Sequence, residues 1–398
     1  MSKTQDVDVV KTYKSDRIKY EIARRIIVPF VKSKFNFVVE KRYNMPDEPF
    51  NLICNHVTNL DMVWIALSID KHLYFVAGEQ VVRKGIGGKL VNWGFHPIVR
   101  EKATVGLSTV VEMKKRLQAG HNVGLFAEGV RSADGLSNPI VPSSAAVLKK
   151  LGYTVVTFKL HGGFFTSPRW ASDIRRGRMC GELVNVYSPE DIKKMSADEF
   201  DRALTADIFE DAYEYNKERK IAYKSKKAAE GIEFELVMCP KCGRMATIKS
   251  NKDTFFCDCG LKGLYNEYGL LSGEEFEYTT IPEWDTWQRQ QIDALSFEDK
   301  DEIILTHPDQ IMTEISKDHT ETTAGKGTLT LTPSAISVGE KIIPIDEIRD
   351  VDIFYHGYLL ISTKDKKYYE ISNPEFKYPG YLYKLLVKKL MNEQKAEK

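Results

Sequence analysis

The feature that most constrains the fold is an alternation of short apolar runs with helical patterns over the first 232 residues. Runs typical of buried strands occupy residues 49–56, 72–79, 122–129, 153–160 and 182–187. Residues 107–120 and 143–152 between them have the apolar spacing of crossover helices. Strands alternating with helices predict an α/β domain over residues 1–232, with a mainly parallel sheet flanked by helices. A charged helical segment is expected at residues 198–230, where this domain ends.

A cysteine cluster marks a second, smaller domain at residues 233–272. Cys239 and Cys242 form one pair, Cys257 and Cys259 form the other, and a glycine follows each pair. Four thiolates at this spacing suit one tetrahedral Zn²⁺, and a site closed by four thiolates is structural rather than catalytic. We therefore expect a zinc ribbon. The alternatives are a redox dithiol or plain buried cysteines.

Residues 282–398 predict a third domain of different type. A helical pattern is followed by short strand-like runs with turn signals between them, and an amphipathic helix closes the chain. This is the pattern of an antiparallel β domain capped by one C-terminal helix. It resembles a pleckstrin-homology-like (PH-like) domain in topology, which implies an interaction or docking module.

Charge and hydropathy exclude several classes of function. The chain has 57 Lys and Arg against 56 Asp and Glu, so it lacks the basic excess of proteins that coat nucleic acid, and no nucleic-acid partner is expected. No apolar run approaches the ~18 residues of a membrane-spanning helix. The polar N-terminus lacks the apolar core of a signal peptide, so a cytoplasmic location is expected.

The N-terminal region departs from this balance, with eleven Lys and Arg against five Asp and Glu in residues 1–45. Within residues 17–35, Ile18, Ile22, Ile26 and Phe30 recur at helical spacing among cationic side chains. A basic amphipathic helix of this kind lies in an anionic membrane interface. The alternative is a helix that docks its apolar stripe on the protein core. A second stretch, residues 86–95, could add Leu90, Val91 and Trp93 to an interface.

Candidate catalytic residues follow the first predicted strand, in the sequence N-H-V-T-N-L-D. His56 comes directly after the strand, and Asp61 falls in the first turn of the next predicted helix. A carboxylate there can accept the imidazole N–H, which makes His56 a general base for a hydroxyl group. No G-x-S-x-G nucleophile elbow is present, which favours direct attack by the substrate hydroxyl. A helix-capping aspartate beside a core histidine is the alternative.

Two further blocks lie at later strand ends, G-F-H-P-I-V-R at residues 94–100 and F-A-E-G-V-R-S at residues 126–132. With N-H-x4-D, their order and spacing resemble the signature blocks of the PlsC-type glycerolipid acyltransferases (the 1-acyl-sn-glycerol-3-phosphate acyltransferase family) over about the first 200 residues. Arginine forks also suit phosphate oxygens on chemical grounds. The substrate-binding residues that the resemblance implies are Arg100, Glu128, Gly129, Arg131 and Ser132.

The resemblance implies an activity. His56 deprotonates the free hydroxyl of lysophosphatidic acid, which attacks the thioester of acyl-CoA or acyl carrier protein and gives phosphatidic acid. Asp61 orients His56, and Arg100 and Arg131 bind the acceptor phosphate. The alternatives are glycerol-3-phosphate or another lysophospholipid as acceptor, or a non-catalytic lipid-binding scaffold. Since both substrates carry lipid or lipid-like chains, the resemblance also favours the interfacial interpretation of residues 17–35 and a peripheral, monotopic association with membranes.

The family's fourth block, a strand with a V-P-I-V-P character, is not clearly present. Residues 139–142, P-I-V-P, lie too soon after Ser132, and residues 153–163, where the block is expected, lack the proline. The departure concerns the region that forms a substrate pocket in the family.

Overall fold

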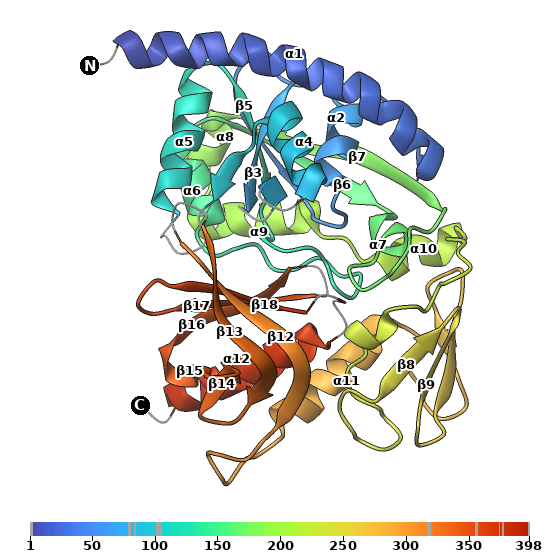
Figure 1. The fold of residues 1–398 in the computed structure, drawn as a ribbon. Helices are drawn as coiled ribbons and strands as arrows, with labels where there is room; N and C mark the ends of the chain where they lie inside the picture. The colour runs from blue at the N-terminus through green and yellow to red at the C-terminus, as the bar shows by residue number, and fades with distance from the viewer. Residues whose placement is uncertain are drawn as a thin grey trace. The chain divides into compact units, whose positions relative to one another are not determined.

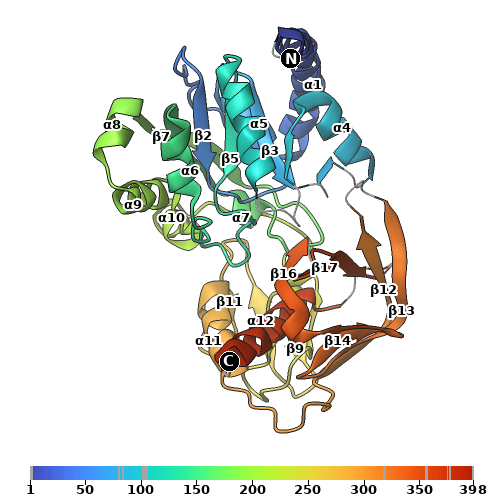
Figure 2. The ribbon, with the colours of Figure 1, turned by 90° about the vertical axis from the view of Figure 1, so that its left-hand side faces the viewer.

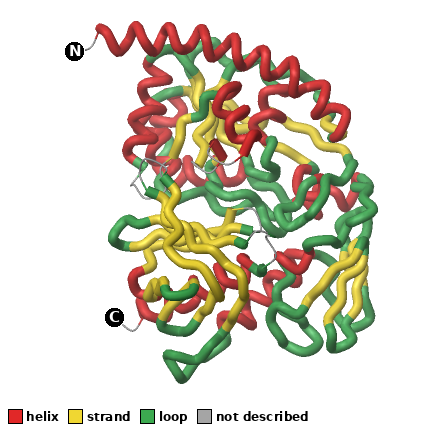
Figure 3. Tube along the Cα trace, in the orientation of Figure 1, coloured by secondary structure: helices red, strands yellow, loops and turns green. Residues whose placement is uncertain are grey.

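The computed structural model describes residues 3–78, 81–82, 85–100, 106–316, 320–354, 357–373, 375 and 378–396, with the side chains of 3–13, 28, 30–33 and 85–87 outside the description. The chain forms two compact units. Unit 1 comprises residues 1–168 and 174–225, and unit 2 comprises residues 169–173 and 226–398. Both predicted smaller domains fall within unit 2. Figures 1 and 3 show the helices and strands of the two units.

Unit 1 is built on a seven-stranded sheet with the strand order β1-β7-β6-β2-β5-β3-β4. All of its pairings are parallel except that of β6 with β7. This agrees with the mainly parallel sheet that the sequence predicts. The strands are β1 (Asn36–Phe37), β2 (Phe50–Cys54), β3 (Leu73–Gly78), β4 (Ile98–Arg100), β5 (Asn122–Phe126), β6 (Thr154–His161) and β7 (Arg178–Tyr187).

Helices flank both faces of this sheet (Figure 2). Along β2, Leu52 and Cys54 pack in a core with residues of α1, α2 and α4, whereas Ile53 packs in a second core with α6, α8 and α9. This alternation follows from the two-residue period of a strand. The helices are α1 (Lys3–Lys34), α2 (Asp61–Ser68), α4 (Gly85–Phe95), α5 (Leu107–Gln118), α6 (Ser144–Leu151), α7 (Gly163–Thr166), α8 (Pro189–Lys194), α9 (Ala197–Ile208) and α10 (Ala212–Arg219).

The predicted helical segment at residues 198–230 is only partly helical. α9 ends before Phe209, which is extended, and α10 ends at Lys220, whose left-handed φ of 48° terminates the helix. Residues 220–231 then run without a regular helix. The charged composition suits a solvated helix, but Asp211 starts α10 as a separate helix by accepting hydrogen bonds from the amides of Tyr213 and Glu214.

Unit 2 combines a small sheet with a larger antiparallel sheet. The small sheet has the order β11-β10-β9-β8 and follows the 3₁₀ helix η1 (Ile232–Phe234). Val237 and Met238, close to the cysteine cluster, pack in the same core as the strands of the larger sheet. The small-sheet strands are β8 (Ile248–Asn251), β9 (Thr254–Cys257), β10 (Lys262–Tyr265) and β11 (Leu271–Ser272).

The larger sheet has seven strands in the order β15-β14-β13-β12-β18-β17-β16, and all its neighbours are antiparallel. Helix α12 packs against β16 and β17. This confirms an antiparallel C-terminal sheet. The remaining elements are α11 (Ile281–Asp293), β12 (Leu305–Ile315), β13 (Glu321–Leu331), β14 (Ala335–Val338), β15 (Lys341–Pro344), η2 (Ile345–Glu347), β16 (Ile348–Phe354), β17 (Tyr358–Thr363), β18 (Tyr368–Ser372) and α12 (Gly380–Ala396).

Helix α1 does not dock its isoleucine stripe on the core. Tyr20 and Ala23 are buried, whereas Ile18, Ile22 and Ile26 are 61%, 42% and 66% exposed. Phe30 lies outside the described side chains. The helix therefore presents the stripe that the sequence singles out to the surface and packs on the domain through another face.

Candidate functional site

The predicted active-site residues meet at one edge of the sheet in unit 1. His56 follows β2, Arg100 ends β4, and Glu128 follows β5. Because these three strands are parallel to their neighbours in the sheet, their carboxyl ends lie at the same edge. Ligands of open α/β sheets gather at such an edge. The three sequence blocks therefore converge in space, as expected.

His56 and Asp61 form a hydrogen-bonded pair. His56 Nδ1 lies 2.7 Å from Asp61 Oδ2, and Asp61 is almost completely buried. The same carboxylate accepts hydrogen bonds from the amides of Val57 (2.7 Å) and Thr58 (2.9 Å). Since Asp61 is the first residue of α2, the helix dipole also favours its negative charge. Because a carboxylate oxygen can only accept, Nδ1 donates its proton to Asp61, and Nε2 is the nitrogen left for a substrate.

Aromatic rings fix the plane of the imidazole. The His56 ring stacks on Phe126 with centroids 4.4 Å apart and an interplanar angle of 17°. Phe126 stacks in turn on Phe75 at 5.6 Å. The His56 side chain keeps 23% exposure, so it can reach a substrate while its ring orientation is held.

Two residues of the third block hold the main chain of His56. Glu128 Oε1 accepts the His56 amide N–H at 2.8 Å, and the Ser132 amide donates to the His56 carbonyl at 2.9 Å. Glu128 Oε2 accepts two bonds from Asn138, from its amide at 2.6 Å and its side-chain nitrogen at 3.1 Å. Burial raises the pKa of Glu128 to about 8, although these hydrogen bonds oppose the shift. The observed contacts of Glu128 and Ser132 thus orient the histidine, and their predicted contact with substrate stays a prediction.

Gly129 forms a tight turn within the third block. Its φ is 73°, and its amide donates to the carbonyl of Phe126 at 3.0 Å. A Cβ at this position would lie 3.0 Å from Val141 Cγ2 and 3.9 Å from Arg100 Nη1. A side chain here would be strained by the backbone and crowded by Val141. The positive φ and the contact with Val141 therefore favour glycine at this position, and Arg100 Nη1 lies nearby.

The two predicted phosphate-binding arginines differ in burial. Arg100 is exposed at the end of β4, whereas Arg131 is 9% exposed in the loop after β5. Both belong to the same sheet edge as His56. The guanidinium groups of an exposed and a buried arginine at this edge could both make bidentate contacts with phosphate oxygens.

Other residues complete the site, although the sequence analysis gave them no role of their own. Asn55 bridges to β6 by donating to the carbonyl of Leu160 (2.9 Å) and accepting from its amide (2.8 Å). Thr58 donates its hydroxyl to Asp61 Oδ1 at 2.6 Å. A threonine three residues before an aspartate that begins a helix was the available signal for Thr58. Nothing in the sequence indicated that Asn138 would bind Glu128.

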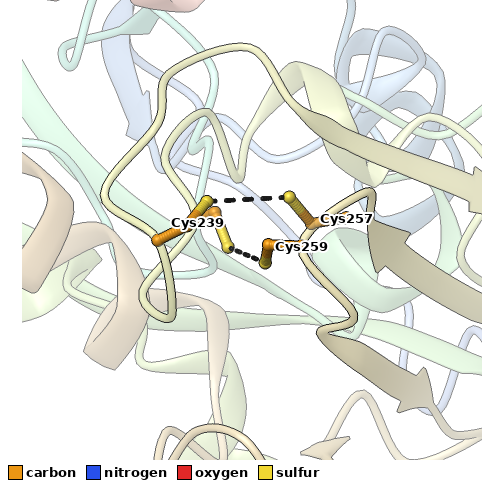
Figure 4. A group of neighbouring side chains, drawn as sticks. Cys239, Cys257 and Cys259 are labelled. Atoms are coloured by element: carbon orange, nitrogen blue, oxygen red, sulfur yellow. Dashed lines mark hydrogen bonds between the residues drawn. The ribbon is translucent and has the colours of Figure 1, made fainter.

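The four clustered cysteines form a second site, in unit 2. Their sulfur atoms all lie within 4.8 Å of one another, and Figure 4 shows the labelled Cys239, Cys257 and Cys259 side chains pointing toward a common centre. Cys239 Sγ is 3.6 Å from Cys259 Sγ, and Cys242 Sγ is 3.9 Å from Cys257 Sγ. Four Zn–S bonds of ~2.3 Å in a tetrahedron place sulfur atoms ~3.8 Å apart. The cluster could therefore hold a metal ion of this size.

The backbone around the cluster has the turns expected from the two glycines. Gly243 and Gly260 have φ values of 70° and 95°, and their amides donate to the carbonyls of Cys239 (2.8 Å) and Cys257 (3.0 Å). Arg244 donates to Cys242 Sγ at 3.5 Å and lowers the pKa of that thiol to about 6. The thiolate, which is the form that binds a metal, is therefore favoured at Cys242.

Among the described residues, no helix is both long enough and apolar enough to cross a lipid bilayer. Besides the stripe on α1, Leu90 and Trp93 of α4 are 55% and 40% exposed. Helices α1 and α4 pack together, and a Cβ on Gly94 would lie 2.8 Å from the Cβ of Ala23. Neighbouring helices of unit 1 thus carry exposed apolar side chains.

Comparisons with known proteins give a family match and a similar solved structure. Residues 36–161 match a family model described as Acyltransferase, and this range contains every predicted catalytic and substrate-binding residue. The match supports an acyltransferase domain in unit 1. No curated protein sequence matches the chain. Among solved structures, the chain is similar to the 1-acyl-sn-glycerophosphate (LPA) acyltransferase PlsC from Thermotoga maritima, with 19% identity, a TM-score of 0.40, and coverage of 52% of this chain and 84% of that one.

Proposed function

We propose that this protein transfers a fatty acyl chain from a thioester donor to the free hydroxyl of lysophosphatidic acid, giving phosphatidic acid. The observation that carries the proposal is the His56–Asp61 pair, 2.7 Å apart, at the sheet edge of a domain that matches the acyltransferase family. A histidine oriented by a buried carboxylate is suited to act as a general base at neutral pH.

The reaction needs one proton acceptor and no covalent enzyme intermediate. His56 Nε2 takes the proton of the acceptor hydroxyl as its oxygen attacks the thioester carbonyl. A C–O bond forms, and the tetrahedral intermediate collapses with cleavage of the C–S bond. The proton on His56 passes to the departing thiolate, which restores the base. Asp61 stabilises the imidazolium between these two proton transfers.

The acceptor phosphate is assigned to Arg100 and Arg131. A phosphomonoester carries nearly two negative charges, and two guanidinium groups at the same sheet edge as the base can neutralise them. Holding the phosphate there would place the glycerol hydroxyl near His56. The close approach of Arg100 to Gly129 supports this arrangement, since it brings the arginine to the loop that holds His56.

The acceptor and the donor are tested by one assay with the purified chain. Labelled acyl-CoA and labelled acyl carrier protein are each offered with lysophosphatidic acid, lysophosphatidylcholine or glycerol-3-phosphate. The proposal expects labelled phosphatidic acid with lysophosphatidic acid and little product with lysophosphatidylcholine, which lacks a free phosphomonoester. Equal turnover of both lysophospholipids would contradict the role of the two arginines, and transfer only to glycerol-3-phosphate would change the assigned acceptor.

We propose further that the four cysteines bind one structural Zn²⁺ in a zinc ribbon. The sulfur–sulfur distances fit tetrahedral thiolate coordination, and four protein ligands leave no open position for a substrate. Bound metal would link β9 to the turn before β8 and thereby stabilise residues 233–272. Cysteines that are not joined in disulfides persist in a reducing compartment, so a zinc site of four cysteines is consistent with the proposed cytoplasmic location.

For the C-terminal domain we propose a PH-like docking module. The support is the strand order and the position of α12 against the sheet. Its partner is not defined by any motif, so the assignment concerns the type of module rather than its ligand.

Peripheral membrane binding completes the proposal, since the acceptor is a lipid. The exposed isoleucines of α1, with Leu90 and Trp93 of α4, would enter the interface, and neighbouring cations would contact anionic headgroups at ~1 kcal/mol each. Sedimentation with vesicles containing phosphatidylglycerol tests this. Replacing Ile18, Ile22 and Ile26 together by serine should weaken binding strongly, whereas the same change at exposed Ile303 and Ile342 of unit 2 should not. Equal binding of both variants would contradict the interface.

A further inference from the structure

One buried residue of unit 1, Trp64, contacts the candidate active site but has no part in the reaction described above. It lies on α2, three residues after Asp61, and is completely buried. Its indole Nε1 donates to Thr58 Oγ1 at 2.9 Å. Thr58 is itself the residue whose hydroxyl donates to Asp61. A continuous line of hydrogen bonds therefore runs from the indole to the candidate base.

The indole is one of three groups that fix the direction of the Thr58 hydroxyl. A hydroxyl group has one proton to donate and two lone pairs to accept with. The lone pairs of Thr58 Oγ1 face two groups that can only donate, Trp64 Nε1 at 2.9 Å and the Leu60 amide at 3.1 Å. The hydroxyl proton is left for Asp61 Oδ1, 2.6 Å away. Without the indole N–H, the hydroxyl would lose one of the two donors that hold it in this direction.

The Thr58 hydroxyl in turn fixes the Asp61 carboxylate. Asp61 Oδ1 accepts from the hydroxyl and amide of Thr58, while Oδ2 accepts from His56 Nδ1 and the Val57 amide. A carboxylate that rotates about its terminal bond loses this alignment, because such torsions are broad. The Thr58 hydroxyl is therefore one of the groups that orient the Asp61 carboxylate, and the Trp64 indole binds directly to that hydroxyl.

Two aromatic rings hold the indole in place. Phe37 stacks on Trp64 with centroids 4.8 Å apart and an angle of 18°, and Phe35 meets it edge-on at 5.0 Å. Phe35 directly follows the end of α1, and Phe37 lies in β1. Such aromatic pairs stabilise a defined ring geometry. The segment that follows the N-terminal helix therefore supplies the two rings that pack on the indole.

We propose that Trp64 is a positioning residue for the His56–Asp61 pair and that it acts through the Thr58 hydroxyl. The rings of Phe35 and Phe37 pack on the indole and hold it in place. The inference rests on the proposed function for its effect on turnover. It assigns no substrate contact to Trp64. Its consequence is that loss of the indole N–H alone lowers the rate of the chemical step while substrate binding is unchanged.

Trp64→Phe removes the N–H and keeps an aromatic ring in the same place. Loss of one ordinary hydrogen bond corresponds to a fall in kcat of about three- to tenfold, with the KM for lysophosphatidic acid unchanged. Trp64→Met, which also lacks the N–H, is the second variant if the phenylalanine fails to pack. Trp284→Phe is the matched control, because this buried tryptophan of unit 2 donates to the carbonyl of Met238 at 3.0 Å and should not affect kcat.

The route through Thr58 is tested by a double-mutant cycle. Thr58→Val removes the hydroxyl and should lower kcat at least as far as Trp64→Phe does, whereas Thr58→Ser restores the hydroxyl and most of the rate. In the Thr58→Val background, Trp64→Phe should have no further effect. Losses that simply multiply in the double variant, or a Trp64→Phe kcat within twofold of the parent, would overturn the proposal.

A second measurement is independent of turnover. Long-range ¹H–¹⁵N spectra of the histidine rings, with the His56 signal assigned from His56→Ala, report which ring nitrogen carries the proton. The parent chain should show His56 protonated at Nδ1, and Trp64→Phe should add the other tautomer. If the parent transfers no acyl group, the proposed function fails, but these spectra still decide the positioning role. Identical His56 spectra in the parent and in Trp64→Phe would refute it.

Discussion

Asp61→Asn changes one atom of a buried side chain and keeps its shape, so its effect can be worked out from the contacts of each carboxylate oxygen. Four groups donate to Asp61: His56 Nδ1, the amides of Val57 and Thr58, and the Thr58 hydroxyl. Asparagine offers only one acceptor oxygen, and its NH₂ group is a donor. Whichever way the asparagine amide turns, some of these four hydrogen bonds are lost.

If the amide oxygen faces His56, the NH₂ group meets the N–H and O–H of Thr58, which are both donors. If the oxygen faces Thr58, the NH₂ group meets the Val57 amide, and His56 Nδ1 must become an acceptor. The proton of the imidazole then moves to Nε2, where the base is needed. Two lost hydrogen bonds to a charged group cost ~3–6 kcal/mol of stability, and loss of the general base costs ~10²–10⁴ in kcat.

The assay compares kcat for acyl transfer and the free energy of unfolding for Asp61→Asn with those for Asp285→Asn. Asp285 is a matched control, because it is also buried and accepts from Gln288, Arg289 and Tyr381 in unit 2. Both variants should be destabilised, but only Asp61→Asn should lose the chemical step. A kcat for Asp61→Asn within threefold of the parent, or an equal loss of kcat in both variants, would refute this account of the pair.

Three further predictions concern phosphate binding, pH and the metal. Arg100→Ala and Arg131→Ala should each raise the KM for lysophosphatidic acid at least ~10-fold, because each removes a charge-assisted contact with the phosphate. Arg219→Ala on α10 is the control and should leave the KM unchanged. An unchanged KM in both site variants would contradict their assigned role. Because the pKa of Glu128 is raised from 4.5 to about 8, the folded chain binds the extra proton between these values, and stability should fall with rising pH there by at most ~1.4 kcal/mol per unit. Denaturant unfolding from pH 5 to 9 should show a flatter dependence for Glu128→Gln than for the parent, and equal slopes would argue against the shift. Elemental analysis of protein purified without chelator should find one zinc per chain. The zinc should be lost in Cys242→Ser but kept in Cys180→Ser, because the Cys180 thiol lies outside the cluster. A metal-free parent chain would contradict the zinc site.

The parallel sheet could be predicted because its central strands are largely buried and rich in apolar residues. Phe50–Cys54 is completely buried, and its neighbours β5 and β6 each have apolar residues at most of their buried positions. Their carboxyl ends carried the three sequence blocks, so the position of the candidate site followed from the fold class. The spacing of the cysteines likewise predicted their cluster. The two cysteines of each pair lie on one short turn, so their positions relative to each other depend mainly on local sequence.

Other elements could not be predicted because their stability comes from partners distant in sequence. Residues 310–315 and 321–327 form a long hairpin of β12 and β13, although their threonine-rich, half-exposed pattern has no strong alternation. Cross-strand pairing stabilises them rather than their own burial. The isoleucine stripe of α1 was apparent in the sequence, but which face docks was decided by Tyr20 and Ala23, and only the packed structure shows this.

The same limit applies within the site. His56 and Asp61 are close in sequence, so their pairing could be anticipated, but the clamp on the His56 main chain comes from Glu128 and Ser132, more than seventy residues away. A carboxylate in a signature block gives no sign of whether it faces substrate or backbone. Its hydrogen-bond partners became known only when the loops after β2 and β5 were placed together.

The central claim is that His56 is the base of an acyl transfer from a thioester to a phospholipid hydroxyl. The most direct measurement follows release of free thiol and formation of labelled phosphatidic acid by the parent chain and by His56→Ala, with folding checked by circular dichroism. We expect the parent to release one thiol for each phosphatidic acid formed and His56→Ala to form neither while remaining folded. A folded His56→Ala protein that turns over like the parent would contradict the claim.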